Sequence, residues 1–283
     1  MKKTLKWRLD LWWILFSYAM KLKGRFRIAA ILSLVSAVFS ACIYFFVSKV
    51  VVGGTNSLIG GYGSGDYFAY VLAGMMITAV VSVGLTMTLS TMRELFWANK
   101  LEAMLMTKMG VGTYLASAMI LSFIYASLNI LLFLGIGVAI FGTSFHVGQG
   151  GLLVVLIILL SSFAVSGIGL MATGAFVFMG AKLGSEPVTW IFLTLQGFVA
   201  GIYFPPTLLP PPVNYLSGLI PQSFGVEALR QVLLNGRGLT DQAVLLPVLS
   251  LFAYCLISFP VGLMTFKAAM RRVESRGSLG RWV

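Results

Sequence analysis

The sequence predicts an all-α polytopic membrane protein with six transmembrane helices. Of its 283 residues, 59% are hydrophobic and only 10% are charged, whereas soluble domains carry roughly 25% charged residues. Residues 109–181 contain no charged side chain, and His146 is their one histidine. A backbone in hydrocarbon must satisfy its N–H and C=O groups internally, so long uncharged runs indicate membrane helices. A chain of this length holds about six such spans joined by short loops.

Residues 1–27 predict an amphipathic helix that lies in the cytoplasmic membrane interface. Lys and Arg residues interrupt and follow a short apolar run, and no small-x-small cleavage site is present, which argues against a cleaved signal peptide. Drawn as a helix, the segment separates its apolar residues from its charged residues. The apolar face consists of Trp7, Leu11, Ile14, Leu15, Tyr18 and Leu22.

Six apolar segments follow and form the expected transmembrane domain, residues 28–266. A glycine-rich loop separates the first two, a charged segment the next two, and a tight turn at residues 142–150 the third from the fourth. The fifth begins just after Pro187 and ends where a proline run begins. The predicted spans are 28–52, 67–91, 111–141, 151–181, 188–203 and 243–266.

The distribution of basic residues predicts the orientation. With six spans, 17 of the 20 Lys and Arg residues lie on the side that holds both ends of the chain. They include a basic tail at residues 267–283, whereas Lys49, Arg230 and Arg237 lie on the other side. Cytoplasmic loops carry the excess of Lys and Arg, so both termini are expected in the cytoplasm. The same distribution explains the net charge of +12 without nucleic acid.

The residues that would power transport or catalysis are absent from the sequence. No ionisable residue lies in the middle of a predicted span, although most ion-coupled carriers and proton pumps need one there. No P-loop or cluster of metal ligands is present, and His146 is expected in an exposed turn. Cys42 and Cys255 lie in apolar runs, where we expect them as free thiols. Energy for transport must therefore come from another polypeptide.

Residues 92–108 predict a charged amphipathic helix in a cytoplasmic loop. Trp97, Leu101, Met104 and Leu105 fall on one face of such a helix. Its charges have both signs, whereas a helix that rests on lipid usually has a strong excess of Lys and Arg. Docking onto a partner protein is thus favoured over contact with lipid, which stays the alternative. The charged residues are Arg93, Glu94, Lys100 and Glu102.

Residues 204–236 predict a hairpin that dips back into the outer leaflet. Six of the nine prolines lie between Pro205 and Pro221, so no single helix can cover this segment. Residues 222–235 predict a short helix with an apolar face, while Glu227, Arg230 and Gln231 line the opposite face. A plain external loop is the alternative, but so much apolar sequence favours the re-entrant hairpin.

Two segments, together with the order of the spans, resemble the permease subunits of ABC-2 type exporters. The first segment is the charged loop, through Arg93-Glu94 and the run Leu101-Glu102-Ala103-Met104-Leu105-Met106-Thr107. The second follows the fifth span and contains Gly201, Pro205, Pro210, Pro221, Glu227 and Arg230. The resemblance covers almost the whole chain.

The resemblance implies a membrane subunit without catalytic activity of its own. Two copies, or this chain and a related permease, would pair in the plasma membrane with two cytoplasmic ATPases that bind ATP and Mg. The permease itself would bind no cofactor or metal. It would export a hydrophobic or amphiphilic substrate such as a drug, a lipid or a lipid-linked glycan. An ion-coupled carrier or channel that works without an ATPase is the alternative.

The resemblance also assigns roles to particular residues. Residues 92–108 would be the coupling helix, which transmits ATP-driven movement of the ATPase to the spans. Its expected docking residues are Arg93, Glu94, Trp97, Lys100, Leu101, Glu102 and Leu105. The expected substrate path, along the fifth span, includes Phe192, Thr194, Gln196, Phe198 and Tyr203.

Overall fold

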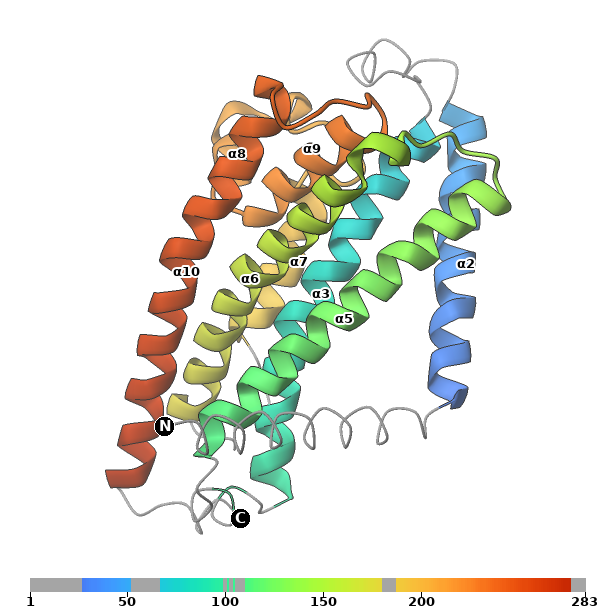
Figure 1. The fold of residues 1–283 in the computed structure, drawn as a ribbon. Helices are drawn as coiled ribbons and strands as arrows, with labels where there is room; N and C mark the ends of the chain where they lie inside the picture. The colour runs from blue at the N-terminus through green and yellow to red at the C-terminus, as the bar shows by residue number, and fades with distance from the viewer. Residues whose placement is uncertain are drawn as a thin grey trace, which may run out of the picture.

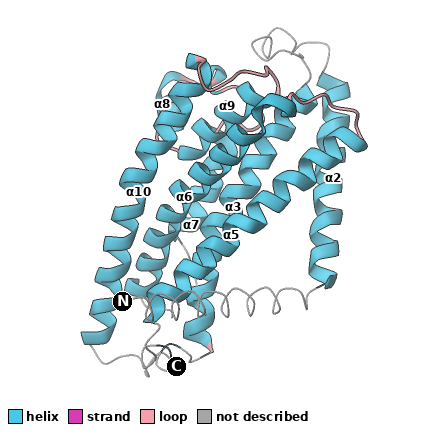
Figure 2. Cartoon of the chain, viewed as in Figure 1, coloured by secondary structure: helices cyan, strands magenta, loops and turns pink. Residues whose placement is uncertain are grey.

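The computed structural model describes residues 27–51, 67–98, 101, 104, 110–179 and 187–275. In this part of the chain every regular element is a helix, and no strand is present (Figure 2). The expected interfacial helix at residues 1–27 and the end of the basic tail lie outside the described residues. Within the described residues, Cys42 and Cys255 are free thiols, as expected.

Four helices are long and apolar enough to cross a membrane: α3 (Tyr67–Trp97), α5 (Gly110–Ala139), α6 (Val147–Met179) and α10 (Gln242–Ser275). They correspond to the second, third, fourth and sixth predicted spans. In Figure 1, α3, α6 and α10 run downward and α5 runs upward. The architecture is that of a polytopic helical membrane protein.

The first and fifth predicted spans correspond to α2 (Arg27–Val51) and α7 (Pro187–Val199). The prediction that the fifth span extends to Tyr203 is wrong, because the helix ends at Val199. Its 13 residues make about 20 Å of helix, less than the roughly 30 Å thickness of a hydrocarbon core. The positive φ of Gly201 (73°) and the prolines that follow it prevent α7 from continuing.

Between α7 and α10 the chain forms three short helices. They are the 3₁₀ helix η2 (Pro206–Leu208), α8 (Pro211–Ser217) and α9 (Pro221–Leu233). Each begins with proline, whose fixed φ suits the first helical position and whose missing N–H costs no hydrogen bond there. We call α8 and α9 the hairpin, and the end of the bundle that carries it the hairpin end (top of Figure 1).

The second predicted span was expected to end at residue 91, but α3 continues to Trp97. Met92, Leu95 and Phe96 are buried in a cluster with side chains from the ends of α6 and α10 and the start of α5. This packing carries the helix beyond the apolar part of its sequence. We call this the far end of the bundle (bottom of Figure 1).

The helices α6 and α10 lie closely side by side because small residues face each other. A Cβ added to Gly167 would lie 2.5 Å from the Ser258 carbonyl carbon, and one added to Gly174 would lie 3.1 Å from the Phe266 nitrogen. The Ser258 hydroxyl donates to the Ala164 carbonyl at 3.0 Å. Such close approach of backbones is typical of membrane helices.

Candidate functional site

The side chain of Arg230 joins three parts of the hairpin end. It is 1% exposed, although the sequence prediction placed it on the polar face of its helix. Its Nε donates to the Tyr70 carbonyl at 3.1 Å, Nη1 to the Gly201 carbonyl at 2.8 Å, and Nη2 to the Ile202 carbonyl at 2.8 Å. Since Tyr70 belongs to α3 and Gly201 follows α7, one guanidinium links α9 to both. The sequence predicted which residues share this face of α9, but it did not predict that α3 and the segment after α7 enclose that face.

Two neighbouring residues fit closely around this guanidinium. Its carbon Cζ lies 3.4 Å from the centre of the Tyr70 ring, so the cation stacks on the aromatic face. The Tyr70 hydroxyl donates to the Gly201 carbonyl at 3.5 Å. A Cβ added to Gly74 would lie 2.8 Å from the Ile202 oxygen and 3.0 Å from Arg230 Nη2. Glycine at position 74 therefore permits the approach of this loop to α3.

The tip of the hairpin is held far down the long helices. Gln222 Nε2 donates to Thr78 Oγ1 at 3.0 Å, and the Tyr254 hydroxyl donates to the Gly218 carbonyl at 2.9 Å. Thr78 lies 11 residues after the start of α3, which is about 16 Å along the helix. The contact of Tyr254 in α10 is about 18 Å from that helix's start. The segment between α8 and α9 therefore lies well below the first turns of α3 and α10, although Gly218 and Leu219 within it are exposed.

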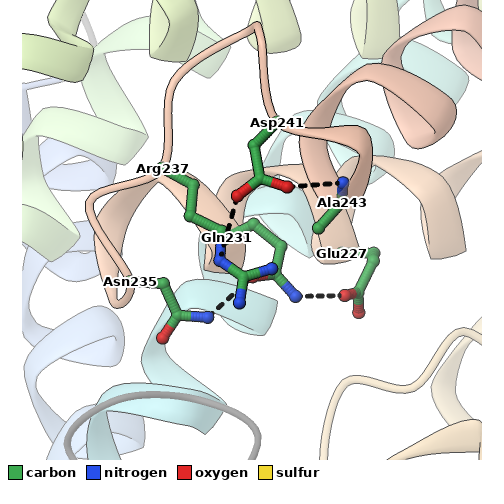
Figure 3. A network of polar contacts seen from close by, with 6 residues as sticks. All are labelled: Glu227, Gln231, Asn235, Arg237, Asp241 and Ala243. Atoms are coloured by element: carbon green, nitrogen blue, oxygen red, sulfur yellow. Dashed lines mark hydrogen bonds and ion pairs between the residues drawn. The ribbon is translucent and has the colours of Figure 1, made fainter.

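A polar network connects α9 to the start of α10 (Figure 3). Gln231 Nε2 donates to Glu227 Oε1 at 2.8 Å, and Asn235 Nδ2 donates to Gln231 Oε1 at 2.6 Å. Arg237 Nε lies 3.4 Å from Asp241 Oδ2, and the other oxygen of Asp241 accepts from the Ala243 N–H at 3.0 Å. Asp241 therefore caps α10 while it pairs with the exposed Arg237.

The other motif residues of the hairpin differ in environment. Pro205 and Pro221 are buried, Glu227 is half-buried and Pro210 is exposed. The apolar face predicted for this segment is confirmed, because its side chains are buried against α3, α6 and α10. They are Val226, Leu229, Val232 and Leu233.

The five residues expected along a substrate path do not meet at one surface. Gln196 is buried and Phe192 half-buried, whereas Thr194 and Phe198 are exposed on the opposite face of α7. The ring of Tyr203 stacks on that of Tyr44 from α2, with centroids 5.2 Å apart. α7 therefore has an inward face with a buried amide and an outward face that is apolar and open.

The far end contains the described residues of the expected coupling helix. Trp97 is 64% exposed, Glu94 is exposed, and the Arg93 guanidinium lies 5.0 Å from the centre of the Trp97 ring. Leu101 is 3% exposed and packs in the far-end cluster. The expected apolar stripe is thus divided, with Leu101 inside and Trp97 outside. Lys100, Glu102 and Leu105 lie outside the described residues.

The sequence prediction missed three residues that support the hairpin: Tyr70, Thr78 and Tyr254. Each lies inside an apolar span, where a Tyr or Thr is common and no spacing distinguishes it. Only the three-dimensional contacts identify them. Among the described residues, no group of three or more His, Cys, Asp or Glu side chains could hold a metal ion.

The described fold and its polar contacts define a polytopic helical membrane protein with a helical hairpin packed into one end. Neither the protein-family models nor the curated proteins compared with this chain give a match.

Proposed function

We propose that this chain is the membrane permease subunit of an ATP-binding-cassette exporter, driven by a separate ATPase that docks at the far end. One observation carries the proposal. At that end α3 projects an exposed Glu94 and Trp97, while Leu101, just past the helix, is anchored in the cluster formed with α6 and α10. A partner that binds Glu94 and Trp97 and then moves would also displace α3, because the same segment is packed into the bundle through Leu101.

The same helix, α3, provides a route from the docking end to the hairpin end. Its first turns contact Arg230 through the Tyr70 carbonyl, and its middle contacts Gln222 through Thr78. A displacement of Trp97 along or about the axis of α3 is therefore passed to the hairpin through two hydrogen-bonded points. In an exporter, this would couple ATP-driven closure of the ATPases to the external side of the substrate path.

The proposed topology has six spans with both termini in the cytoplasm of a plasma-membrane protein. The interfacial helix at 1–27, the far end and the tail at 267–283 face the cytoplasm, and the hairpin is re-entrant from outside. The depth of the hairpin tip, beside Thr78 and Tyr254, supports that assignment. The alternating directions of α2, α3, α5 and α6 support it as well, and α10 runs in the same direction as α6, as expected if α7 crosses between them (Figure 1).

The working unit would contain two permeases, identical or related, and two ATPases that bind ATP and Mg. The open outward face of α7, with Thr194 and Phe198, is suited to a second permease and to the substrate path between the two. The apolar character of this face fits a hydrophobic or amphiphilic substrate, such as a drug, a lipid or a lipid-linked glycan.

Co-purification tests the proposal. The tagged full chain is expressed with the genes adjacent to its own, extracted in detergent, and assayed for ATP hydrolysis and for bound subunits by mass spectrometry. We expect a stoichiometric ATPase. Reversing the charge of both Glu94 and Glu102 to Lys should abolish the activity bound to the permease, because a docking groove that accepts carboxylates rejects cations.

The matched control is Asp241→Lys, which reverses one acid at the hairpin end and removes its half-exposed ion pair with Arg237 and its bond from the Ala243 N–H, both at the opposite end from Glu94. It should leave the bound ATPase activity unchanged. Recovery of the folded chain without any ATPase, together with transport in vesicles that ignores ATP, would overturn the proposal. That result would favour an ion-coupled carrier or channel.

A further inference from the structure

We propose that the far end of α10, together with the end of α6, binds the headgroup of an anionic phospholipid. Three cationic side chains of α10, Lys267, Arg271 and Arg272, are exposed at this end of the bundle. They follow directly on the exposed apolar face of the same helix. The ligand is a phosphodiester headgroup with its acyl chain attached. The inference holds whether or not an ATPase docks on α3.

The apolar face of α10 provides the surface for the acyl chains. Its exposed side chains recur through the length of the helix at spacings of three and four residues, so they form one strip. This strip includes Leu249, Leu256, Ile257, Val261 and Met264. Met264, the last of them, is 69% exposed. Since no helix of the described chain covers the strip, it faces the hydrocarbon of the bilayer.

The cations begin where the strip ends. Lys267 lies three residues after Met264, and Arg271 lies four residues after Lys267. Met264, Lys267 and Arg271 therefore share one face of the helix. About 1.5 Å of rise per residue places the two cations roughly 5–11 Å beyond Met264 along the axis. In the proposed site, one lipid would therefore place its acyl chains on the strip and its phosphate beside these cations.

Arg272 is held beside them by α6. Its Cζ lies 4.2 Å from the centre of the Phe178 ring, and Phe178, near the end of α6, is 57% exposed. Stacking on an aromatic face fixes a guanidinium while leaving its N–H groups free to donate to phosphate. The site is thus shared by two helices, and one of its three cations is positioned before a ligand arrives.

Three exposed cations at one end of α10 favour an anionic ligand here. Basic groups between membrane helices bind anionic headgroups, and each contributes about a fivefold gain in affinity. Three such groups give a selectivity of about one hundredfold over a zwitterionic lipid with the same acyl chains.

Native mass spectrometry of the full chain in a neutral detergent tests the site. The protein is titrated with phosphatidylglycerol and with phosphatidylcholine of identical acyl chains, and retained lipid is counted. We expect at least one tightly retained phosphatidylglycerol. The variant Lys267→Gln/Arg271→Gln should lose about 25-fold in affinity for phosphatidylglycerol. Arg237→Gln, a matched exposed cation at the opposite end, should bind as the unchanged protein does.

Two further arms make the test decisive. Phe178→Leu keeps the apolar surface but removes the stacking partner of Arg272, so affinity should fall severalfold while the melting temperature stays the same. Inorganic phosphate at millimolar concentration should not displace the lipid, because it lacks the acyl chains. Equal retention of the two lipids, an equal loss in Arg237→Gln, or displacement by free phosphate would overturn the proposal.

Discussion

Replacement of Arg230 by Met should destabilise the protein strongly, although the two side chains have nearly the same volume. The substitution removes three hydrogen bonds, to the carbonyls of Tyr70, Gly201 and Ile202, and leaves those oxygens buried without the donors they now have. The Gly201 carbonyl keeps only the Tyr70 hydroxyl, at 3.5 Å. The hydrogen bonds from Arg230 of α9 to α3 and to the segment after α7 are thereby lost, whereas Gln222 still donates to Thr78.

The magnitude follows from the number of bonds. Hydrogen bonds inside membrane proteins contribute about 0.6 kcal/mol each on average and up to about 1.7 kcal/mol. Three of them give about 2–5 kcal/mol. A change of 1 kcal/mol shifts the melting temperature of a chain of this size by about 2–4 °C. We therefore expect Arg230→Met to lower the melting temperature by about 4–20 °C.

The two native thiols allow the melting temperature to be measured without introducing further cysteines. Cys42 and Cys255 are free and half-buried, so a thiol-reactive fluorophore reports unfolding of the full chain in detergent. Arg237→Met, at a half-exposed ion pair, is the control and should shift the melting temperature by less than about 2 °C. Gly74→Ala should resemble Arg230→Met, because the new methyl group displaces the Ile202 carbonyl. An unchanged melting temperature in Arg230→Met would refute this reasoning.

Three further substitutions test other contacts by the same assay. Gly167→Ala should cost about 1–3 kcal/mol by forcing α6 away from α10, whereas Gly151→Ala, where a Cβ would meet nothing within 4 Å, should be neutral. Leu101→Ala should cost about 2–5 kcal/mol because its side chain is buried, whereas Trp97→Ala should leave the melting temperature unchanged and weaken only ATPase binding. Tyr254→Phe should cost about 1 kcal/mol through its lost bond to the Gly218 carbonyl, measured against Tyr215→Phe, whose ring is exposed.

The long membrane helices were predictable because their signal is local. The uncharged run from 109 to 181 predicted two spans and a tight turn, and α5 and α6 occupy it with ends displaced by one to four residues. The proline positions likewise predicted that the fifth span must stop, and the apolar pattern after them predicted one short helix, which corresponds to α9. Composition and proline chemistry act on neighbouring residues, so no knowledge of the packing was needed.

The environment of Arg230 was not predictable, because it depends on contacts between residues far apart in the sequence. A helical projection placed it with Glu227 and Gln231 on one face of α9, but a projection does not show what covers that face. In the folded chain α3 and the segment after α7 cover that side. The end of α3 shows the same limit: its charges suggested a boundary at residue 91, but packing of Met92 and Phe96 extends the helix.

The close contact of α6 and α10 limits which helices can move relative to one another. With Gly167 and Gly174 set against the backbone of α10, and the Ser258 hydroxyl bonded to the Ala164 carbonyl, neither helix can slide or rotate without collision. We therefore expect α6 and α10 to move together as one rigid pair of membrane helices. In the proposed exporter, opening and closing would therefore involve α2 and α7, which pack against this pair less closely than α3 and α9 do.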